Sequence, residues 1–242
     1  MSDTARLLGV RARPNSVWAS RFAAVAARLG RDYGMPSLGN FRDPVKEIFY
    51  ILLSAKTTDA QYRATHRKLW TAYPRLAALA AARVADIRAC IASGGLAGKR
   101  GPQIRATAEA LLRAGKTRPG AFLKSLQTDE AFAFLRNLPG VGPKSAFCVM
   151  MYSLGADVFP VDVNVQRIAE RLGAIPKGLT HHQAQRRLAA VVPPGSAQAL
   201  HVGMVAHGRR VCLPRTPHCD ACGLVDLCRR GRAFLATQKG SL

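Results

Sequence analysis

The sequence predicts an all-α protein. Apolar residues recur with the spacing of one helix face along the chain, for example at positions 45, 48, 49, 52 and 53 of the segment 44–54. No segment shows the alternation of apolar and polar residues that marks a half-buried strand. Proline, glycine and capping residues separate the helical segments. We therefore expect helices packed on helices, with no sheet.

Composition and charge narrow the class of protein further. The chain has 242 residues, 48% of them hydrophobic, which allows an adequate core in one large or two modest domains. No apolar run is long enough to cross a membrane. Thirty-six Lys and Arg against fourteen Asp and Glu give a net charge of +22. This charge implies a polyanionic partner, nucleic acid ahead of anionic lipid, and its spread along the chain predicts a basic face on a folded body.

The N-terminal residues 1–16 are predicted to be a loose basic leader, because they are rich in arginine and contain no secretory apolar segment. An organellar transit peptide is the less favoured alternative. We expect a cytoplasmic monomer, associated with the nucleoid if the protein is bacterial. A helix should follow the leader from Ser16 to about Leu29.

The segment 138–144, Leu-Pro-Gly-Val-Gly-Pro-Lys, joins two helical stretches. Gly140 and Gly142 tolerate positive φ and leave no side chain over the backbone, so their N–H groups can face outward together. Pro143, at the first position of the next helix, presets φ at no cost in hydrogen bonds. A glycine hairpin at a helix N-terminus is an anion site, and a DNA phosphate is the obvious anion.

Lys144 and Asp162 are the candidate catalytic residues. Lys144 falls in the first turn of a helix, where the helix dipole and partial burial disfavour an ammonium and leave some neutral amine, as a nucleophile requires. Asp162 follows an extended segment and precedes another helix. The alternative is a plain phosphate contact for Lys144 and a plain helix cap for Asp162, and the residues alone leave the two interpretations about equal.

Four of the six cysteines predict a metal site. Cys212, Cys219, Cys222 and Cys228 are spaced C-x6-C-x2-C-x5-C within 17 residues, in a chain without a secretory signal. Tetrahedral zinc and a cubane iron–sulfur cluster both use four cysteines, and the spacing chemistry leaves both open. The two other cysteines stand singly in apolar stretches, which is typical of buried thiols.

These motifs together resemble a known family. The run LPGVGPKSA followed by VDVNVQRIAERLG is similar to the helix-hairpin-helix Gly/Pro-Asp signature of the DNA glycosylase superfamily, most closely its endonuclease III branch. The cysteine run resembles the [4Fe–4S] loop of that branch. The resemblance implies that Lys144 is the Schiff-base nucleophile, that Asp162 is its catalytic partner, and that the four cysteines hold a [4Fe–4S] cluster.

The resemblance also suggests two DNA contacts. LLSAKTTD is similar to a family element whose glutamine fills the space left by the extruded base, and Lys56 stands at that position. Leu96 matches a leucine that acts as a wedge in the base stack. The alternatives are a solvated surface charge for Lys56 and a buried turn leucine for Leu96.

The chain departs from the family pattern in three places. Asn164 stands where histidine is usual, and Pro143 stands where arginine or lysine is common. Gly101-Pro102 replaces the alanine at which a helix usually begins, so we expect the helix to start only at Gln103. Neither the Asn164 change nor the Pro143 change touches the reacting groups.

The domains and function implied by the resemblance are as follows. A six-helix barrel over 37–156 contains the hairpin, and a cluster domain with a frayed C-terminal tail occupies 157–242, joined by the leader and helix of 1–36. Lys144 and Asp162 would face each other across a DNA-binding cleft. The expected activity is base excision repair of double-stranded DNA that contains a damaged base, an oxidised pyrimidine as in the family, or an abasic site, by base flipping, glycosylase and lyase steps.

Three alternatives share some of these features. One is a mismatch glycosylase of the same superfamily, which typically lacks a lysine at the hairpin position. Another is a non-enzymatic, zinc-bearing DNA-binding module. The last is a family member with weak catalysis that mainly binds DNA.

Overall fold

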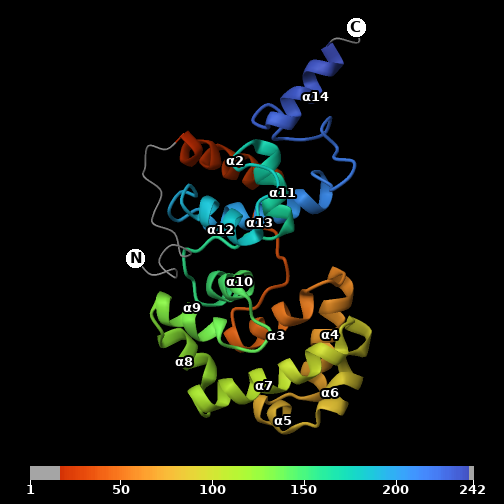
Figure 1. Cartoon of the computed structure of the whole chain (residues 1–242), viewed down its shortest axis with the longest axis vertical. Helices are drawn as coiled ribbons and strands as arrows, with labels where there is room; N and C mark the ends of the chain where they lie inside the picture. Colours follow the sequence, from red (N-terminus) through yellow and green to blue (C-terminus); the bar gives the residue numbers. More distant parts are fainter. Residues whose placement is uncertain (1–16, 240–242) are drawn as a thin grey trace. The chain divides into compact units, whose positions relative to one another are not determined.

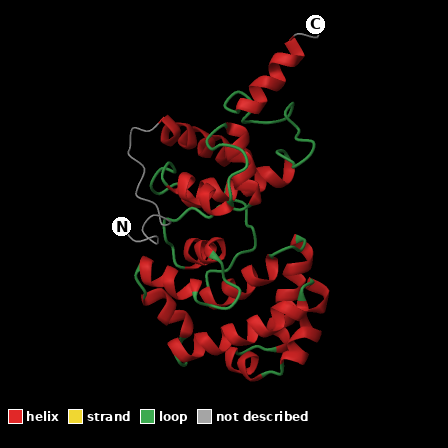
Figure 2. Ribbon diagram, in the orientation of Figure 1, coloured by secondary structure: helices red, strands yellow, loops and turns green. Residues whose placement is uncertain are grey.

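The computed structural model describes residues 17–239, so the predicted leader lies outside the described residues. Within that range every regular element is a helix and none is a strand, as Figure 2 shows, and the all-α prediction is confirmed. No helix of this range combines the length and the apolar character that crossing a membrane requires.

The chain divides into two compact units, described separately here. Unit 2 is the continuous segment 39–156, and unit 1 combines the described residues of 1–38 and 157–242. The helices, labelled in Figure 1, are as follows. Unit 2 contains α3 (Pro44–Ser54), α4 (Asp59–Ala72), α5 (Leu76–Ala81), α6 (Val84–Ile91), α7 (Ala97–Gly115), α8 (Pro119–Ser125), α9 (Thr128–Arg136) and α10 (Pro143–Ser153). Unit 1 contains α2 (Val17–Tyr33), α11 (Val163–Leu172), α12 (His181–Ala189), α13 (Ala197–Arg210) and α14 (Arg229–Lys239).

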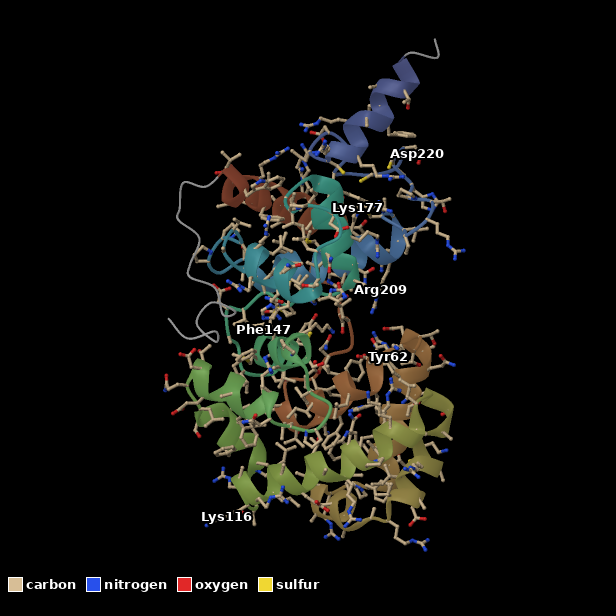
Figure 3. All side chains as sticks on the ribbon, in the orientation of Figure 1. Tyr62, Lys116, Phe147, Lys177, Arg209 and Asp220 are labelled. Atoms are coloured by element: carbon tan, nitrogen blue, oxygen red, sulfur yellow. The ribbon has the colours of Figure 1, made fainter. Side chains whose placement is uncertain are left out.

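Helix α3 lies at the centre of unit 2. It starts at Pro44 because the Asp43 carboxylate accepts hydrogen bonds from the first-turn amides and proline suits the first helical position. Almost all of its residues are buried, and it packs against α4, α8 and α10. Helices α9 and α10 are joined by the stacked rings of Phe132 and Phe147, whose centroids are 4.8 Å apart; Phe147 is labelled in Figure 3.

Helix α7 begins earlier than the sequence predicted, at Ala97 rather than Gln103, so the helical prediction was wrong for this boundary. Proline within a helix removes the N–H that would bond to the carbonyl four residues earlier, here that of Gly98. The Arg88 guanidinium compensates by donating to this carbonyl oxygen at 3.1 Å. The helix can therefore continue through Pro102.

The core of unit 1 forms where α2 meets α13. Phe22, Val25 and Leu29 of α2 are fully buried in one apolar cluster with residues of α11, α12 and α13. The two helices approach closely at Gly203, where an added Cβ would lie 2.8 Å from the Leu29 Cβ. Glycine is therefore required at this crossing.

Residues 229–239 form a helix, which corrects the prediction of a frayed tail for this part of the chain. Helix α14 begins as the Arg232 amide donates to the Cys228 carbonyl oxygen at 2.8 Å. An added Cβ on Gly231 would collide with the backbone of Val225. The start of α14 is thus packed tightly on the preceding loop, and the helix also contacts α11.

Buried Glu47 of α3 makes the stability of the protein depend on pH. Its carboxylate accepts hydrogen bonds from the Phe41 amide at 2.8 Å and the Asn40 amide group at 2.5 Å. Burial raises the pKa of Glu47 from 4.5 to about 7. A carboxyl whose pKa is raised by folding stabilises the native state below its unfolded pKa, and this contribution is lost as pH rises through the folded pKa.

We therefore expect Glu47→Gln to gain about 3 kcal/mol of unfolding free energy relative to wild type as the pH is raised from 4 to 8. Asn40 can turn its amide oxygen toward the new NH2 group, so the substitution is tolerated. Urea unfolding at several pH values measures the difference. The control is Glu109→Gln, which removes a half-buried carboxylate of α7; a pH-independent gap between Glu47→Gln and wild type would contradict the account.

Candidate catalytic and cysteine sites

The hairpin between α9 and α10 contains a tight turn. Its Val141 amide donates to the Leu138 carbonyl oxygen at 3.0 Å, and Gly140 has φ +83°. Proline at the second position and a glycine of positive φ at the third are the requirements of a type II turn. Leu138 and Val141 are both buried, so the two ends of the turn are anchored in the core of unit 2.

Two side chains of helix α7 contact this turn. The Thr107 hydroxyl donates to the Pro139 carbonyl oxygen at 3.2 Å. The Gln103 carboxamide covers Gly140, where an added Cβ would lie 2.8 Å from it. Gly142 differs from Gly140, because its φ is −84° and an added Cβ would meet nothing within 4 Å. The tolerance of glycine for positive φ is therefore used at Gly140, whereas Gly142 leaves the space over its backbone open.

Lys144 is positioned by this hairpin. Gly142 is the N-cap of α10 and Pro143 its first residue, so Lys144 falls in the first turn and is half-buried. Gly142 supplies no side-chain cap, and the positive end of the helix is open to an outside acceptor. A lysine and a helix N-terminus without a side-chain cap are thus combined in a single turn of chain.

Asp162 is the N-cap of α11. Its Oδ1 accepts from the amides of Asn164 and Val165, both at 2.8 Å, and its Oδ2 accepts from the Asn164 side chain at 3.1 Å. The predicted cap is present, and these bonds hold the half-buried carboxylate in one orientation. Lys144 belongs to unit 2 and Asp162 to unit 1, so their predicted meeting across a cleft stays a prediction.

Two arginines of α11, both missed by sequence reasoning, bind the loop that carries Cys212, and one of them also reaches Asp162 through Asn164. Arg167 donates to the Asn164 side-chain oxygen at 2.8 Å and to the Cys212 carbonyl oxygen at 3.0 Å. Arg171 donates to the Cys212 sulfur at 3.1 Å and to the Leu213 carbonyl oxygen at 2.7 Å. Their spacing of four residues places both on one helix face, which was the available signal.

The four clustered cysteines line one pocket. Cys212, Cys219, Cys222 and Cys228 surround it together with apolar residues of α11 and the loop after α13. Burial raises the pKa of Cys222 to about 11, so without a cation this thiol is protonated. In the described part of the chain, no three His, Cys, Asp or Glu residues are placed to hold a single metal ion.

The neighbours of the pocket favour an anionic sulfur at Cys212 and oppose it at Cys228. Arg171 donates to the Cys212 sulfur, as noted, while the Cys228 thiol lies 3.2 Å from the Arg171 carbonyl oxygen. His207 contacts the Cys222 sulfur at 3.6 Å through Nε2 and Tyr33 at 2.9 Å through Nδ1. Burial lowers the pKa of His207, so its imidazole is neutral. The donor set of four thiols with hydrogen-bonding neighbours fits a thiolate-ligated metal centre.

Lys56 and Leu96 lie on two exposed turns of unit 2. Both have φ +53°, which is uncommon for residues other than glycine. The Leu96 side chain is 49% exposed, so the alternative of a buried turn leucine is wrong. Both side chains are available to an outside partner.

Comparison with known proteins identifies the family. Residues 49–194 match the HhH-GPD superfamily base excision DNA repair protein family. The chain is 30% identical over 189 residues to endonuclease III of Escherichia coli strain K12, covering 78% of this chain and 85% of that protein.

Solved structures of endonuclease III share the fold. One is a non-covalent complex with DNA, with a TM-score of 0.78 at 23% identity. The other is a trapped covalent intermediate with DNA, with a TM-score of 0.78 at 22% identity. Each covers 90% of this chain and 98% of the solved chain. The family match over residues 49–194 and the 30% identity over 189 residues show that this chain belongs to the HhH-GPD superfamily of base excision DNA repair proteins and is endonuclease III-like.

Proposed function

We propose that the protein is a base excision repair DNA glycosylase with an associated lyase activity at abasic sites. Its substrate is double-stranded DNA that carries a damaged base, in particular an oxidised pyrimidine. The observation that supports this most strongly is the position of Lys144 in the first turn of α10, directly after the type II turn. The net charge of +22 fits a DNA substrate.

Lys144 supplies the nucleophile. Its amine attacks C1′ of the everted nucleotide, so a C–N bond forms as the glycosidic bond breaks and the base leaves with a proton. Opening of the sugar ring gives a protonated Schiff base, which acidifies the proton on C2′. Loss of that proton expels the 3′ phosphate, and water then releases Lys144 from the nicked strand.

Asp162 stabilises the positive charge that develops on the sugar as the base departs. The bonds from Asn164 and Val165 hold its carboxylate, so no reorientation is needed during the reaction. Asn164, which stands where the family usually has histidine, here links Asp162 to Arg167. It therefore preserves the orientation of the carboxylate without contributing a titratable group.

The DNA backbone binds at the hairpin and around the cysteine loop. The open N-terminus of α10 takes a phosphate through backbone amides. Around the cysteine loop, the exposed arginines 209, 210, 215, 229, 230 and 232 supply further phosphate contacts. Arg209 is labelled in Figure 3 near the end of α13. Lys56 fills the space left by the extruded base, and Leu96 is the wedge.

The four cysteines hold a [4Fe–4S] cluster in this proposal. Such a cluster crosslinks the loop that carries them and keeps its sulfurs deprotonated. The chain's own contribution is the loop geometry set by Arg167 and Arg171, which bind the Cys212 carbonyl and sulfur. Because the same arginine network reaches Asp162 through Asn164, the loop also supports the catalytic carboxylate.

Borohydride trapping separates the roles of Lys144 and Asp162. Lys144→Gln should abolish the covalent adduct with abasic DNA, because no amine is left at the hairpin. Asp162→Asn should still form that adduct, yet release a damaged base about 100-fold more slowly in single turnover. Undamaged and mismatched duplexes serve as substrate controls. An adduct of normal yield with Lys144→Gln would refute the nucleophile, and cleavage restricted to mismatches would favour the mismatch glycosylase.

The two hairpin glycines should respond differently to alanine. Gly140→Ala should lose more than about 1 kcal/mol of unfolding free energy, since positive φ and contact with Gln103 both oppose a Cβ. Gly142→Ala should change stability by less than about 1 kcal/mol but weaken DNA binding, because its Cβ would occupy the space of the phosphate. Fluorescence anisotropy with a lesion duplex measures the affinity. Unchanged affinity of Gly142→Ala would rule out the phosphate site.

Metal analysis tests the cluster. The purified protein should contain iron and acid-labile sulfide in equal amounts, about four of each per chain. Cys219→Ser should lose most of both, whereas Cys90→Ser, which alters a buried thiol of α6, should retain them. Stoichiometric zinc without sulfide would show that the pocket holds a different centre.

A further inference from the structure

Arg100 is a buried arginine that the proposed mechanism does not use. It lies in the first turns of α7 and is only 4% exposed. Its position continues the apolar face of that helix, four residues before fully buried Ile104. Burial lowers the pKa of Arg100, although an arginine remains charged at any ordinary pH. A charge placed in this way needs a specific set of partners.

The partners of Arg100 are backbone carbonyls of two different loops. Its Nη1 donates to the carbonyl oxygens of Gly94 at 2.8 Å and Gly95 at 3.0 Å. Its Nη2 donates to the carbonyl oxygen of Ala55. One guanidinium group therefore ties the turn after α3 to the turn before α7.

Two of these three carbonyls immediately precede a residue proposed to enter the DNA. Ala55 is followed by Lys56, and Gly95 is followed by Leu96. Both Lys56 and Leu96 have φ +53°, a left-handed conformation that costs free energy for residues with a Cβ. Such conformations persist only where the surroundings enforce them, and they cluster at functional sites. Arg100 fixes the peptide that leads into each strained residue.

Only an arginine can make this set of bonds. Its planar guanidinium presents several N–H groups in a rigid fork, so two nitrogens can serve two loops in a fixed relation. A lysine has one nitrogen at the end of a flexible stem and cannot set the distance between the loops. An uncharged side chain would also leave these carbonyls, among them that of buried Gly94, without donors of this strength.

We propose that Arg100 is a positioning residue that locks the Lys56 and Leu96 turns together, so that both side chains enter the opened duplex as one unit. This inference rests on the proposed function, in which a base is extruded from double-stranded DNA. Arg100 itself touches neither the sugar nor the base. Its effect should therefore fall on duplex opening and leave the reaction of Lys144 with an accessible aldehyde unchanged.

The test compares two substrates for Arg100→Lys and Arg100→Gln. On a lesion duplex, single-turnover base release should fall about 10- to 100-fold, in line with the loss of buried charge-assisted hydrogen bonds. On a single-stranded abasic oligonucleotide, where no base must be extruded, borohydride trapping should stay within about 3-fold of wild type. 2-Aminopurine placed opposite the lesion should show less unstacking with the variants. Arg105→Lys, which changes a half-buried arginine of the same helix, is the matched control.

The outcomes separate this inference from the proposed function. Wild type that traps neither substrate would refute the proposed function itself. Active wild type together with undiminished duplex activity of the Arg100 variants would refute the locking role. Equal loss on both substrates would also refute it, because general damage to the fold would then be the cause.

A double-mutant cycle on exposed residues tests the inference even if the Arg100 variants do not fold. If the two turns act as one unit, Lys56→Ala and Leu96→Ala should each abolish much of the 2-aminopurine signal. In single-turnover base release on the lesion duplex, the double variant should then be about 3- to 10-fold faster than the product of the two single effects predicts. Independent, multiplicative effects would overturn the inference.

Discussion

The Pro139–Gly140 turn is the constraint on which the proposed chemistry depends. It reverses the chain within four residues between buried Leu138 and Val141, and it does so through a positive φ that only glycine adopts readily. The next residues open α10 with an uncapped N-terminus. One short segment therefore brings the uncapped N-terminus of α10 and the Lys144 amine together. In the proposed function, this N-terminus binds a DNA phosphate and so delivers the sugar to the nucleophile.

Both units contain arginines whose side chains bind backbone carbonyl oxygens of other segments. In unit 2, Arg100 joins two turns that carry exposed, strained residues. In unit 1, Arg167 joins the loop of Cys212 to Asn164, the partner of Asp162. A guanidinium can serve several carbonyls at once because its donors are rigidly arranged. Part of the positive charge of this protein thus binds backbone carbonyls within the fold.

Features that depend on local patterns could be predicted from the sequence, namely the helices, the hairpin and the cysteine cluster. Prediction failed where distant residues decide. Helix α7 can begin early because Arg88 donates to the Gly98 carbonyl oxygen, whereas Pro102 has no N–H to donate to it. From the sequence alone, Arg100 and Arg167 look like surface charges. Their roles follow from distant partners, the carbonyl oxygens of Ala55 and Cys212. The one sequence signal for the burial of Arg100 is its position on the apolar helix face that includes Ile104.

The identity of the residue that bonds to DNA tests the central claim most directly. Borohydride reduction of the complex with abasic DNA, followed by nuclease and protease digestion and mass spectrometry, locates the sugar remnant on the chain. We predict that the remnant is found on the peptide that contains Lys144, attached to its Nζ. A remnant on another amine, such as Lys56 or the N-terminus, would contradict the claim that the glycine turn presents the nucleophile.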